Sequence, residues 1–244
     1  MTPATIAGMC KLSGLDAAAL TDHNTCGNCA AFCQAAEAYG LLALPGMELC
    51  TREEVHIVCV FPDLERAGAF QEEVYRSLGE ARNDPAIFGR QLYLDTDDRV
   101  LGEESRLLAG ATAIGVYEVP ALVERYGGAA WPAHIDRPSF SLLSNLGLWD
   151  PGLGFSLAEV SRTCPPDFMP GRRDLRGVPT ITGCDAHYLE QISDTGQFME
   201  VPARSREAVL AWLRALPLKD FTVLVCDFAN WAETAPLPCF ILKK

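Results

Sequence analysis

The chain has 244 residues, a hydrophobic content of 49% and a net charge of −12 at pH 7. This length predicts one α/β barrel or two small domains, and no apolar run reaches the roughly 18 residues of a membrane-spanning helix. The N-terminus lacks the basic and apolar regions of a signal peptide, and ten cysteines without features of export are typical of reduced thiols in the cytoplasm. The negative charge disfavours nucleic-acid polymers and anionic membranes as partners, and favours small substrates or acids offset by bound metal.

A helix is predicted first, with Thr2 as its N-cap, Pro3 in its first position and Gly14 as its stop. Residues 15–20 form a short apolar run of the kind that fills a strand buried on both faces. This run ends abruptly in Thr21, Asp22 and His23. Because α/β enzymes keep their chemistry at the ends of such strands, the acid and the imidazole are candidate functional groups.

Alternating elements follow along the chain. Buried strands are predicted at 41–49 and 55–61, after a helix that ends at Gly40, and further helices at about 70–78 and 119–126. The polar stretch at about 83–107 is interpreted as a solvated insertion. Short strands at 157–160, 178–181 and 198–201, a helix at about 209–216 and a strand at 221–226 complete the prediction. With no internal repeat or linker, residues 1–244 are interpreted as a single domain.

Three cysteines are spaced C-x2-C-x3-C, as Cys26, Cys29 and Cys33. This spacing raises the hypothesis of a zinc or iron–sulfur site, and with it a cysteine-based metal or redox protein. However, Cys29 and Cys33 lie one turn apart in a predicted helix, and free cysteine packs as a small apolar residue. Packing is therefore the favoured interpretation.

All four histidines of the chain lie at or beside predicted strand ends, with acids nearby. The residues gathered in this way are Asp22, His23, Glu48, His56, His134, Asp185 and His187. Imidazole and carboxylate together suit zinc, manganese or iron better than calcium or magnesium. A carboxylate such as Glu48 can bridge two cations, an arrangement that polarises phosphoryl groups and activates water.

The motifs around these residues resemble those of the PHP superfamily, named for polymerase and histidinol phosphatase. The matching stretch runs from Thr2 to about Ile192, and its motifs are T-D-H, P-G-M-E, V-H-I-V, P-A-H and D-A-H. The resemblance implies a distorted seven-stranded (β/α)7 barrel that holds up to three divalent metals, mostly in phosphoesterases.

The resemblance also implies how the metal ligands are shared. Glu48 would bridge two metals, with Asp185 joining it on the first. His56 and His134 would complete the second, while His23 and His187 would hold the third.

Asp22 and Arg137 are the candidate catalytic residues. Arg137 is the best candidate cation for a substrate phosphate, because it lies on the loop that follows a strand end. A surface salt bridge between Arg137 and Asp136 is the alternative interpretation.

One family motif is absent: no His-x-His occurs in the 244 residues. The first strand of the predicted barrel is therefore missing, and fewer than three metals are expected. A chain that begins about one strand late is the favoured account, and a real loss of catalysis is the competing one. Without that strand, its neighbours would have unpaired edges and a tendency to self-associate.

The leading functional hypothesis is a metal-dependent hydrolase of phosphate esters, acting on a small phosphomonoester or a nucleotide-like substrate. The alternative is a non-catalytic PHP module that binds a partner or ligand and keeps residual metal sites.

Overall fold

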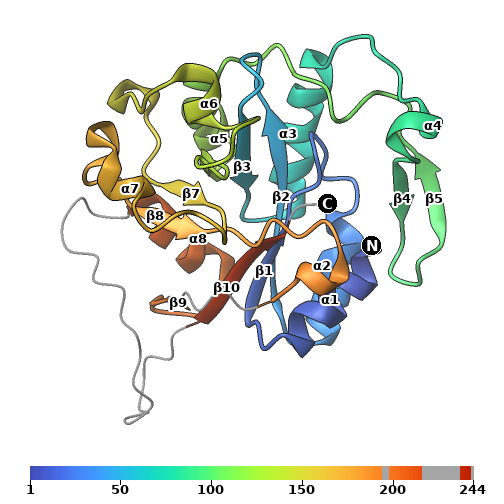
Figure 1. Ribbon diagram of the computed structural model, residues 1–244. Coiled ribbons are helices and arrows are strands. Elements are labelled where there is room, and N and C mark those ends of the chain that lie inside the picture. The colour runs from blue at the N-terminus through green and yellow to red at the C-terminus, as the bar shows by residue number, and fades with distance from the viewer. Residues whose placement is uncertain (194–197, 216–236, 243–244) are drawn as a thin grey trace, which may run out of the picture.

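The computed structural model describes residues 1–193, 198–215 and 237–242 (Figure 1). The N-terminal half contains α1 (Pro3–Leu12), β1 (Ala17–Leu20), α2 (Cys29–Ala38), β2 (Leu42–Cys50), β3 (His56–Val60), α3 (Leu64–Ser77), α4 (Pro85–Phe88), β4 (Leu92–Leu94) and β5 (Val100–Glu103). It continues with η1 (Val116–Glu118), α5 (Val119–Arg125), β6 (Ala129–Pro132), α6 (Leu142–Leu146) and η2 (Pro151–Leu153). The remaining elements are β7 (Ala158–Val160), α7 (Phe168–Gly171), η3 (Arg173–Leu175), β8 (Thr180–Thr182), η4 (Leu189–Gln191), β9 (Phe198–Met199), α8 (Arg206–Ala215) and β10 (Leu237–Leu242).

The architecture is α/β, as predicted, and its centre is a six-stranded sheet in the order β6-β3-β2-β1-β10-β9. β1 runs parallel to β2, whereas β2 with β3 and β3 with β6 are antiparallel. β7 and β8 pair in a separate parallel sheet. The described strands form no closed sheet, so the barrel expected from the family resemblance is not confirmed.

The predicted open edge beside β1 is filled. β10 pairs with β1 in parallel along its whole length, with Ala17 beside Cys239 and Leu20 beside Leu242. The sequence prediction of an unpaired edge at this position is therefore wrong, because a strand distant in the sequence occupies it. The strand predicted at 221–226 lies outside the described residues.

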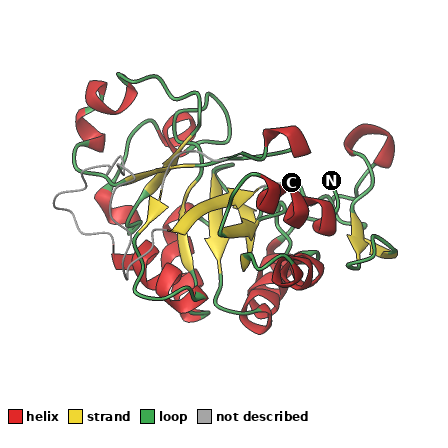
Figure 2. Cartoon of the chain, turned by 90° about the horizontal axis from the view of Figure 1, so that it is seen from below, coloured by secondary structure: helices red, strands yellow, loops and turns green. Residues whose placement is uncertain are grey.

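Local sequence explains how the first elements begin. The backbone N–H of Thr5 donates to the Thr2 hydroxyl, which caps α1 in the way predicted. Helices line the sheet (Figure 2), and the core buries Phe32 of α2, Phe70 of α3 and Trp131 of β6. Full burial of one such side chain contributes about 1.5–3 kcal/mol. Within the described residues, no helix is both long enough and apolar enough to cross a membrane.

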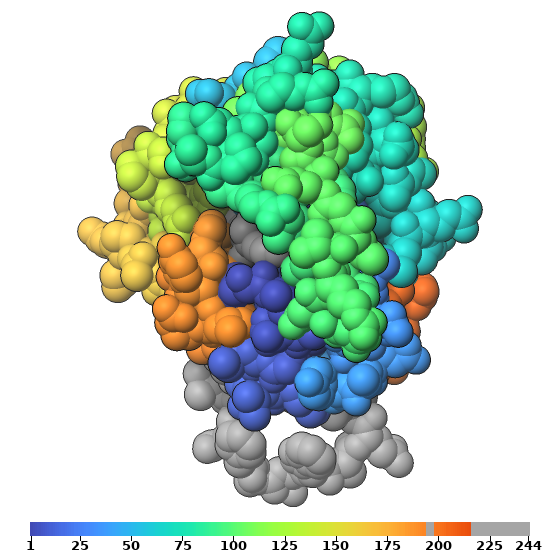
Figure 3. All heavy atoms as spheres, turned by 90° about the vertical axis from the view of Figure 1, so that its right-hand side faces the viewer, coloured from blue at the N-terminus to red at the C-terminus, as the bar shows by residue number. Residues whose placement is uncertain are grey.

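The predicted insertion at 83–107 folds into α4 and the β4–β5 hairpin. The side chain of Asn28 holds this hairpin, donating to the carbonyl of Leu92 (3.1 Å) and accepting from the N–H of Leu94 (3.0 Å). The segment lies beside N-terminal parts of the chain in the space-filling view (Figure 3). It is therefore only partly solvated, and it is fixed next to the loop that carries Asp22.

A buried carboxylate strengthens this attachment. Glu104 accepts two hydrogen bonds from the Arg106 guanidinium (2.8 and 2.7 Å) and one from the Tyr93 hydroxyl (2.9 Å). Burial alone would raise its pKa, but the hydrogen bonds from Arg106 and Tyr93 lower the pKa of Glu104 to about 2. The Arg106 guanidinium also lies 3.7 Å from the centre of the Tyr75 ring on α3.

Glu104→Gln is expected to lower the free energy of unfolding at pH 7 by about 1–3 kcal/mol, because it weakens charged hydrogen bonds in a buried position. Since the pKa of Glu104 falls from 4.5 to about 2 on folding, its contribution is complete above pH 4.5. The contribution declines as the pH falls toward 2. Urea unfolding of both proteins at pH 7 and pH 3 measures the difference, which should shrink at pH 3. The exposed Glu103→Gln is the matched control, and equal effects of the two variants would contradict the prediction.

Candidate metal centre

The register between β1 and β2 continues beyond β1 and places His23 beside Glu48. The N–H of Asn24 donates to the carbonyl of Glu48 (2.9 Å), and the N–H of Glu48 donates to the carbonyl of Asp22 (3.0 Å). His23 and Glu48 form an isolated parallel bridge. As a result, Nδ1 of His23 lies 3.4 Å from Oε2 of Glu48.

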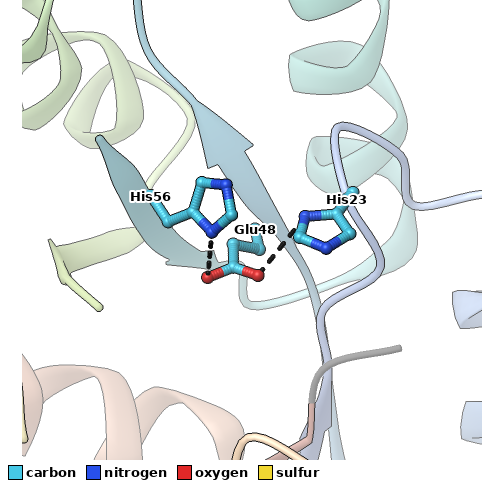
Figure 4. A group of neighbouring side chains, drawn as sticks. All are labelled: His23, Glu48 and His56. Carbon is cyan, nitrogen blue, oxygen red and sulfur yellow. Dashed lines mark ion pairs between the residues drawn. The ribbon is translucent and has the colours of Figure 1, made fainter. Parts of the chain in front are cut away.

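The antiparallel pairing of β2 with β3 brings a second histidine to the same carboxylate. Val58 pairs with Glu48 and His56 pairs with Cys50, so all four side chains share one face of the sheet. Nδ1 of His56 lies 3.2 Å from Oε1 of Glu48. Figure 4 shows His23 and His56 on either side of the carboxylate, one at each oxygen.

A third histidine reaches Glu48 through an unusual backbone conformation. Ala133 follows β6 and donates its N–H to the carbonyl of His56 (3.0 Å), so the next side chain would point to the opposite face of a regular strand. His134 instead has φ of +31°, and the chain leaves the strand direction there. Nε2 of His134 lies 3.5 Å from Oε1 of Glu48.

These distances fit a bound cation. One ligand atom each from His23, Glu48 and His56 lies within 4.8 Å of the other two. Two ligands about 2.0–2.1 Å from a tetrahedral ion are about 3.3 Å apart. The nitrogens of His56 and His134 lie 3.2 and 3.5 Å from Oε1 of Glu48, close to that spacing. Because Glu48 is only 1% exposed, a cation would also offset the cost of burying its charge.

Asp185 and His187 form a second group after β8. Asp185 has φ of +47°, and Nδ1 of His187 lies 3.8 Å from its Oδ1. The two groups adjoin each other, since the ring centres of His23 and His187 are 6.5 Å apart. Thus the four histidines predicted at strand ends lie around one region, while their assignment to individual metals stays a prediction.

The candidate catalytic residues, Asp22 and Arg137, contact side chains other than the histidines. The Arg137 guanidinium forms an ion pair with Oδ2 of Asp185, which is buried. The carboxylate of Asp136, the alternative partner, accepts hydrogen bonds from the backbone and hydroxyl of Ser161. Asp22 is buried at the end of β1 and accepts a hydrogen bond from Asn28 (3.2 Å). Asp22 therefore connects the strand end to the residue that holds the hairpin.

Sequence reasoning missed two polar residues near the site. Asn24 has φ of +50°, and its side chain accepts from the N–H of Cys50 and donates to the carbonyls of Leu108 and Gly110. An asparagine directly after T-D-H was the available signal, because this residue tolerates the left-handed region. Glu159 on β7 is fully buried and accepts from the indole N–H of Trp131 (3.3 Å). No spacing in the sequence marks Glu159.

The cysteines of the C-x2-C-x3-C stretch lie in an apolar environment. Cys29 and Cys33 are buried among α1, α2 and β1, and Sγ of Cys29 lies 3.3 Å from the carbonyl oxygen of Gly46. A hydrogen bond with Cys26 and then burial raise the pKa of the Cys29 thiol, while burial raises the pKa of Cys33 to about 12. These thiols are therefore protonated at neutral pH and pack as apolar groups.

Comparison with known proteins identifies the fold. No family model and no curated protein matches the sequence. Among solved structures, endonuclease Q from Pyrococcus furiosus has a TM-score of 0.58 and 16% identity, over 89% of this chain and 52% of that one. Endonuclease Q in complex with a 27-mer duplex carrying an abasic lesion at the active site gives a TM-score of 0.60 at the same identity and coverage. A "putative metal-dependent phosphoesterase" from Bifidobacterium adolescentis gives 0.53 and 18%, over 77% of this chain and 82% of that one.

The chain therefore shares its fold with endonuclease Q and with the Bifidobacterium protein. A shared fold with a protein described as a metal-dependent phosphoesterase agrees with the resemblance found in the sequence motifs. The chain spans about half the length (52%) of the endonuclease Q chains that it matches. In this shared fold, Glu48 lies on β2 of the central sheet, with His23 beyond the end of β1 and His56 at the start of β3.

Replacing Cys26, Cys29 and Cys33 together with alanine is expected to leave the metal content unchanged. The free energy of unfolding should fall by about 1–3 kcal/mol, because buried thiols are lost from a packed core. Elemental analysis and urea unfolding measure the two quantities. Loss of metal, or of a visible absorption band, would support the cluster hypothesis instead.

Arg137→Gln is expected to strengthen the binding of a divalent cation by about tenfold, equal to ~1.4 kcal/mol. The guanidinium competes for the carboxylate of Asp185, and its removal also relieves repulsion between two positive charges. The same variant should bind inorganic phosphate more weakly. Isothermal titration with zinc and then with phosphate measures both changes in affinity, and the variant Arg76→Gln, at an exposed arginine, is the control. Weaker cation binding by the Arg137 variant would show that the ion pair does not compete.

Proposed function

We propose that this protein is a metal-dependent hydrolase of phosphate esters. The observation that carries the proposal is the buried carboxylate of Glu48, which faces imidazole nitrogens at both oxygens. The PHP fold supports it, because the solved structures with this fold include an endonuclease and a protein described as a phosphoesterase. Both descriptions concern the cleavage of phosphate esters.

Glu48 with His56 and His134 would hold one cation, and Glu48 with Asp185 would contribute to another, while His23 and His187 would be the ligands of a third. Zinc, manganese and iron all accept this mixture of nitrogen and oxygen ligands. When bound, such ions polarise phosphoryl oxygens and lower the pKa of water so that hydroxide forms near neutral pH. Glu48 would bridge two of them.

One further residue would contact the substrate, and two acids would position the groups around it. Arg137 lies on the loop after β6 and is 41% exposed at its side chain, so its guanidinium can contact a phosphate oxygen from the solvent side. Asp185 would fix the orientation of that guanidinium before the substrate arrives. Asp22 would position the His23 loop through Asn28.

The substrate class we favour is a small phosphomonoester or nucleotide-like compound. A net charge of −12 disfavours a polyanion, because phosphate backbones bind through basic surfaces. The endonuclease Q complex contains a DNA duplex, so the fold itself is compatible with both small and polymeric substrates. The net charge of this chain supports the smaller one.

A second candidate function is a non-catalytic binding module. Two observations favour it: the chain has no His-x-His, and the carboxylate of Asp185 already pairs with Arg137. In that case the Glu48 group would hold one structural cation, and no phosphate ester would be hydrolysed.

Glu48→Gln is expected to weaken zinc or manganese binding by more than about 100-fold. Loss of a residue that only supports a metal ligand costs about 10–100-fold, and Glu48 is proposed as a ligand itself. The amide keeps the shape of the side chain but removes the negative charge of the carboxylate that faces His23, His56 and His134. Elemental analysis and isothermal titration measure the loss, and the exposed Glu72→Gln on α3 is the matched control.

Wild-type protein loaded with manganese or zinc should hydrolyse p-nitrophenyl phosphate or nucleoside monophosphates, and both a chelator and His56→Ala should abolish this. Metal binding without hydrolysis of any ester on a broad panel would favour the binding module. If wild-type protein binds no divalent metal at all, both functions are wrong.

A further inference from the structure

We propose that Phe140 is a positioning residue, which fixes the orientation of His56 toward Glu48. The inference rests on the proposed function, because it assigns His56 to the metal centre. It adds a residue that no strand-end motif contains. Three observations around Phe140 carry the argument: a ring stack, a backbone hydrogen bond and a left-handed backbone conformation.

The first observation is the contact between the two rings. The centres of the Phe140 and His56 rings are 4.7 Å apart, and their planes are inclined by 22°. This is the geometry of stacked aromatic rings. An imidazole turns easily about the bond to its ring, because that torsion has broad energy wells. A parallel ring on one side restricts this rotation and keeps Nδ1 of His56 facing Oε1 of Glu48, 3.2 Å away.

The second observation is that Phe140 also fixes the main chain of His56. The N–H of His56 donates to the carbonyl of Phe140 (3.0 Å), and the carbonyl of His56 accepts from the N–H of Ala133 (3.0 Å). The two ends of the loop of residues 133–140 are therefore both hydrogen-bonded to the backbone of His56. This loop carries His134 and Arg137, so the contacts of His56 hold its two ends.

The third observation is the backbone of Phe140 itself, which has φ of +51°. This conformation is strained for a bulky residue and would suit glycine or asparagine better. Phe140 is also 42% exposed, so burial explains only part of its presence. An exposed aromatic residue held in a strained conformation against a candidate ligand is typical of a functional constraint.

The loop beyond Phe140 shows how the strain is maintained. The hydroxyl of Ser141 donates to the carbonyl of Arg137 (2.7 Å), and the same side chain caps α6 through the N–H of Ser144 (3.1 Å). The start of a helix thus fixes the position of Phe140 from its C-terminal side.

Variants at position 140 separate the contribution of the ring from that of the backbone. Phe140→Leu removes the stack but keeps an apolar side chain, and Phe140→Tyr keeps the stack. Phe140→Gly removes both the ring and the strain. Phe88→Leu, at an exposed phenylalanine on α4, is the matched control.

We expect Phe140→Leu and Phe140→Gly to bind zinc about tenfold more weakly than wild type, as is usual when an outer partner of a metal ligand is lost. Phe140→Tyr and Phe88→Leu should stay within about threefold of wild type. The metal-free Phe140→Gly protein should melt no lower than wild type, because its strain is relieved. Cobalt-loaded Phe140→Leu should show a broadened visible spectrum. If Phe140→Leu and Phe140→Gly bind zinc as tightly as wild type and their cobalt spectra are unchanged, the inference is overturned.

A second measurement needs no metal and so separates this inference from the proposed function. Long-range ¹H–¹⁵N spectra of the four histidines, with His56→Ala for assignment, report the tautomer of His56. We expect a single defined tautomer in wild type and Phe140→Tyr, and averaged signals in Phe140→Leu. Identical His56 signals in wild type and Phe140→Leu would overturn the role of Phe140 even if the protein binds metal. Absence of metal binding by wild type would overturn the proposed function alone.

Discussion

The buried charge of Glu48 is the constraint on which the candidate site depends. A carboxylate that is 1% exposed loses its hydration, and the loss is tolerated only when cations or hydrogen-bond donors replace the water. Glu48 lies in the interior of β2, a strand whose residues from Ala43 onward are all buried. Three imidazoles from three different segments face its two oxygens. Strand pairing brings His23 and His56 beside Glu48, and the unusual backbone conformation at His134 turns the third imidazole toward it.

Much of this arrangement could be predicted from the sequence, because strand-end residues follow from short-range patterns. Apolar runs that end in T-D-H or pass through P-G-M-E locate buried strands, and the side chains at their ends meet at one edge of the sheet. The sequence could not predict that β10 lies beside β1, since pairing between strands more than 200 residues apart leaves no local signal. The closed barrel expected from the resemblance was likewise not found among the described strands. The hairpin at 92–103 was missed because its attachment depends on one distant side chain, that of Asn28.

Backbone conformation limits prediction of the site more than residue type does. His134, Phe140 and Asp185 all have positive φ, and each lies on a loop at the candidate site. None is a glycine, so residue type alone does not predict a left-handed conformation at these positions. Such conformations cost free energy and persist only where surrounding contacts enforce them. The sequence could therefore locate the candidate side chains, whereas their directions depend on contacts that only the folded chain contains.

The two buried carboxylates of the site differ in what balances their charge. Glu48 faces imidazole nitrogens, which are common metal ligands. Asp185 faces the guanidinium of Arg137, a group that donates hydrogen bonds and does not bind metal. A cation therefore meets little electrostatic opposition at Glu48, but it must displace or share a permanent charge at Asp185. On the proposed function, Glu48 would be the stronger metal-binding half of the site and Asp185 the half that responds to a phosphate, since an anion that draws Arg137 away would expose the Asp185 carboxylate to a second cation.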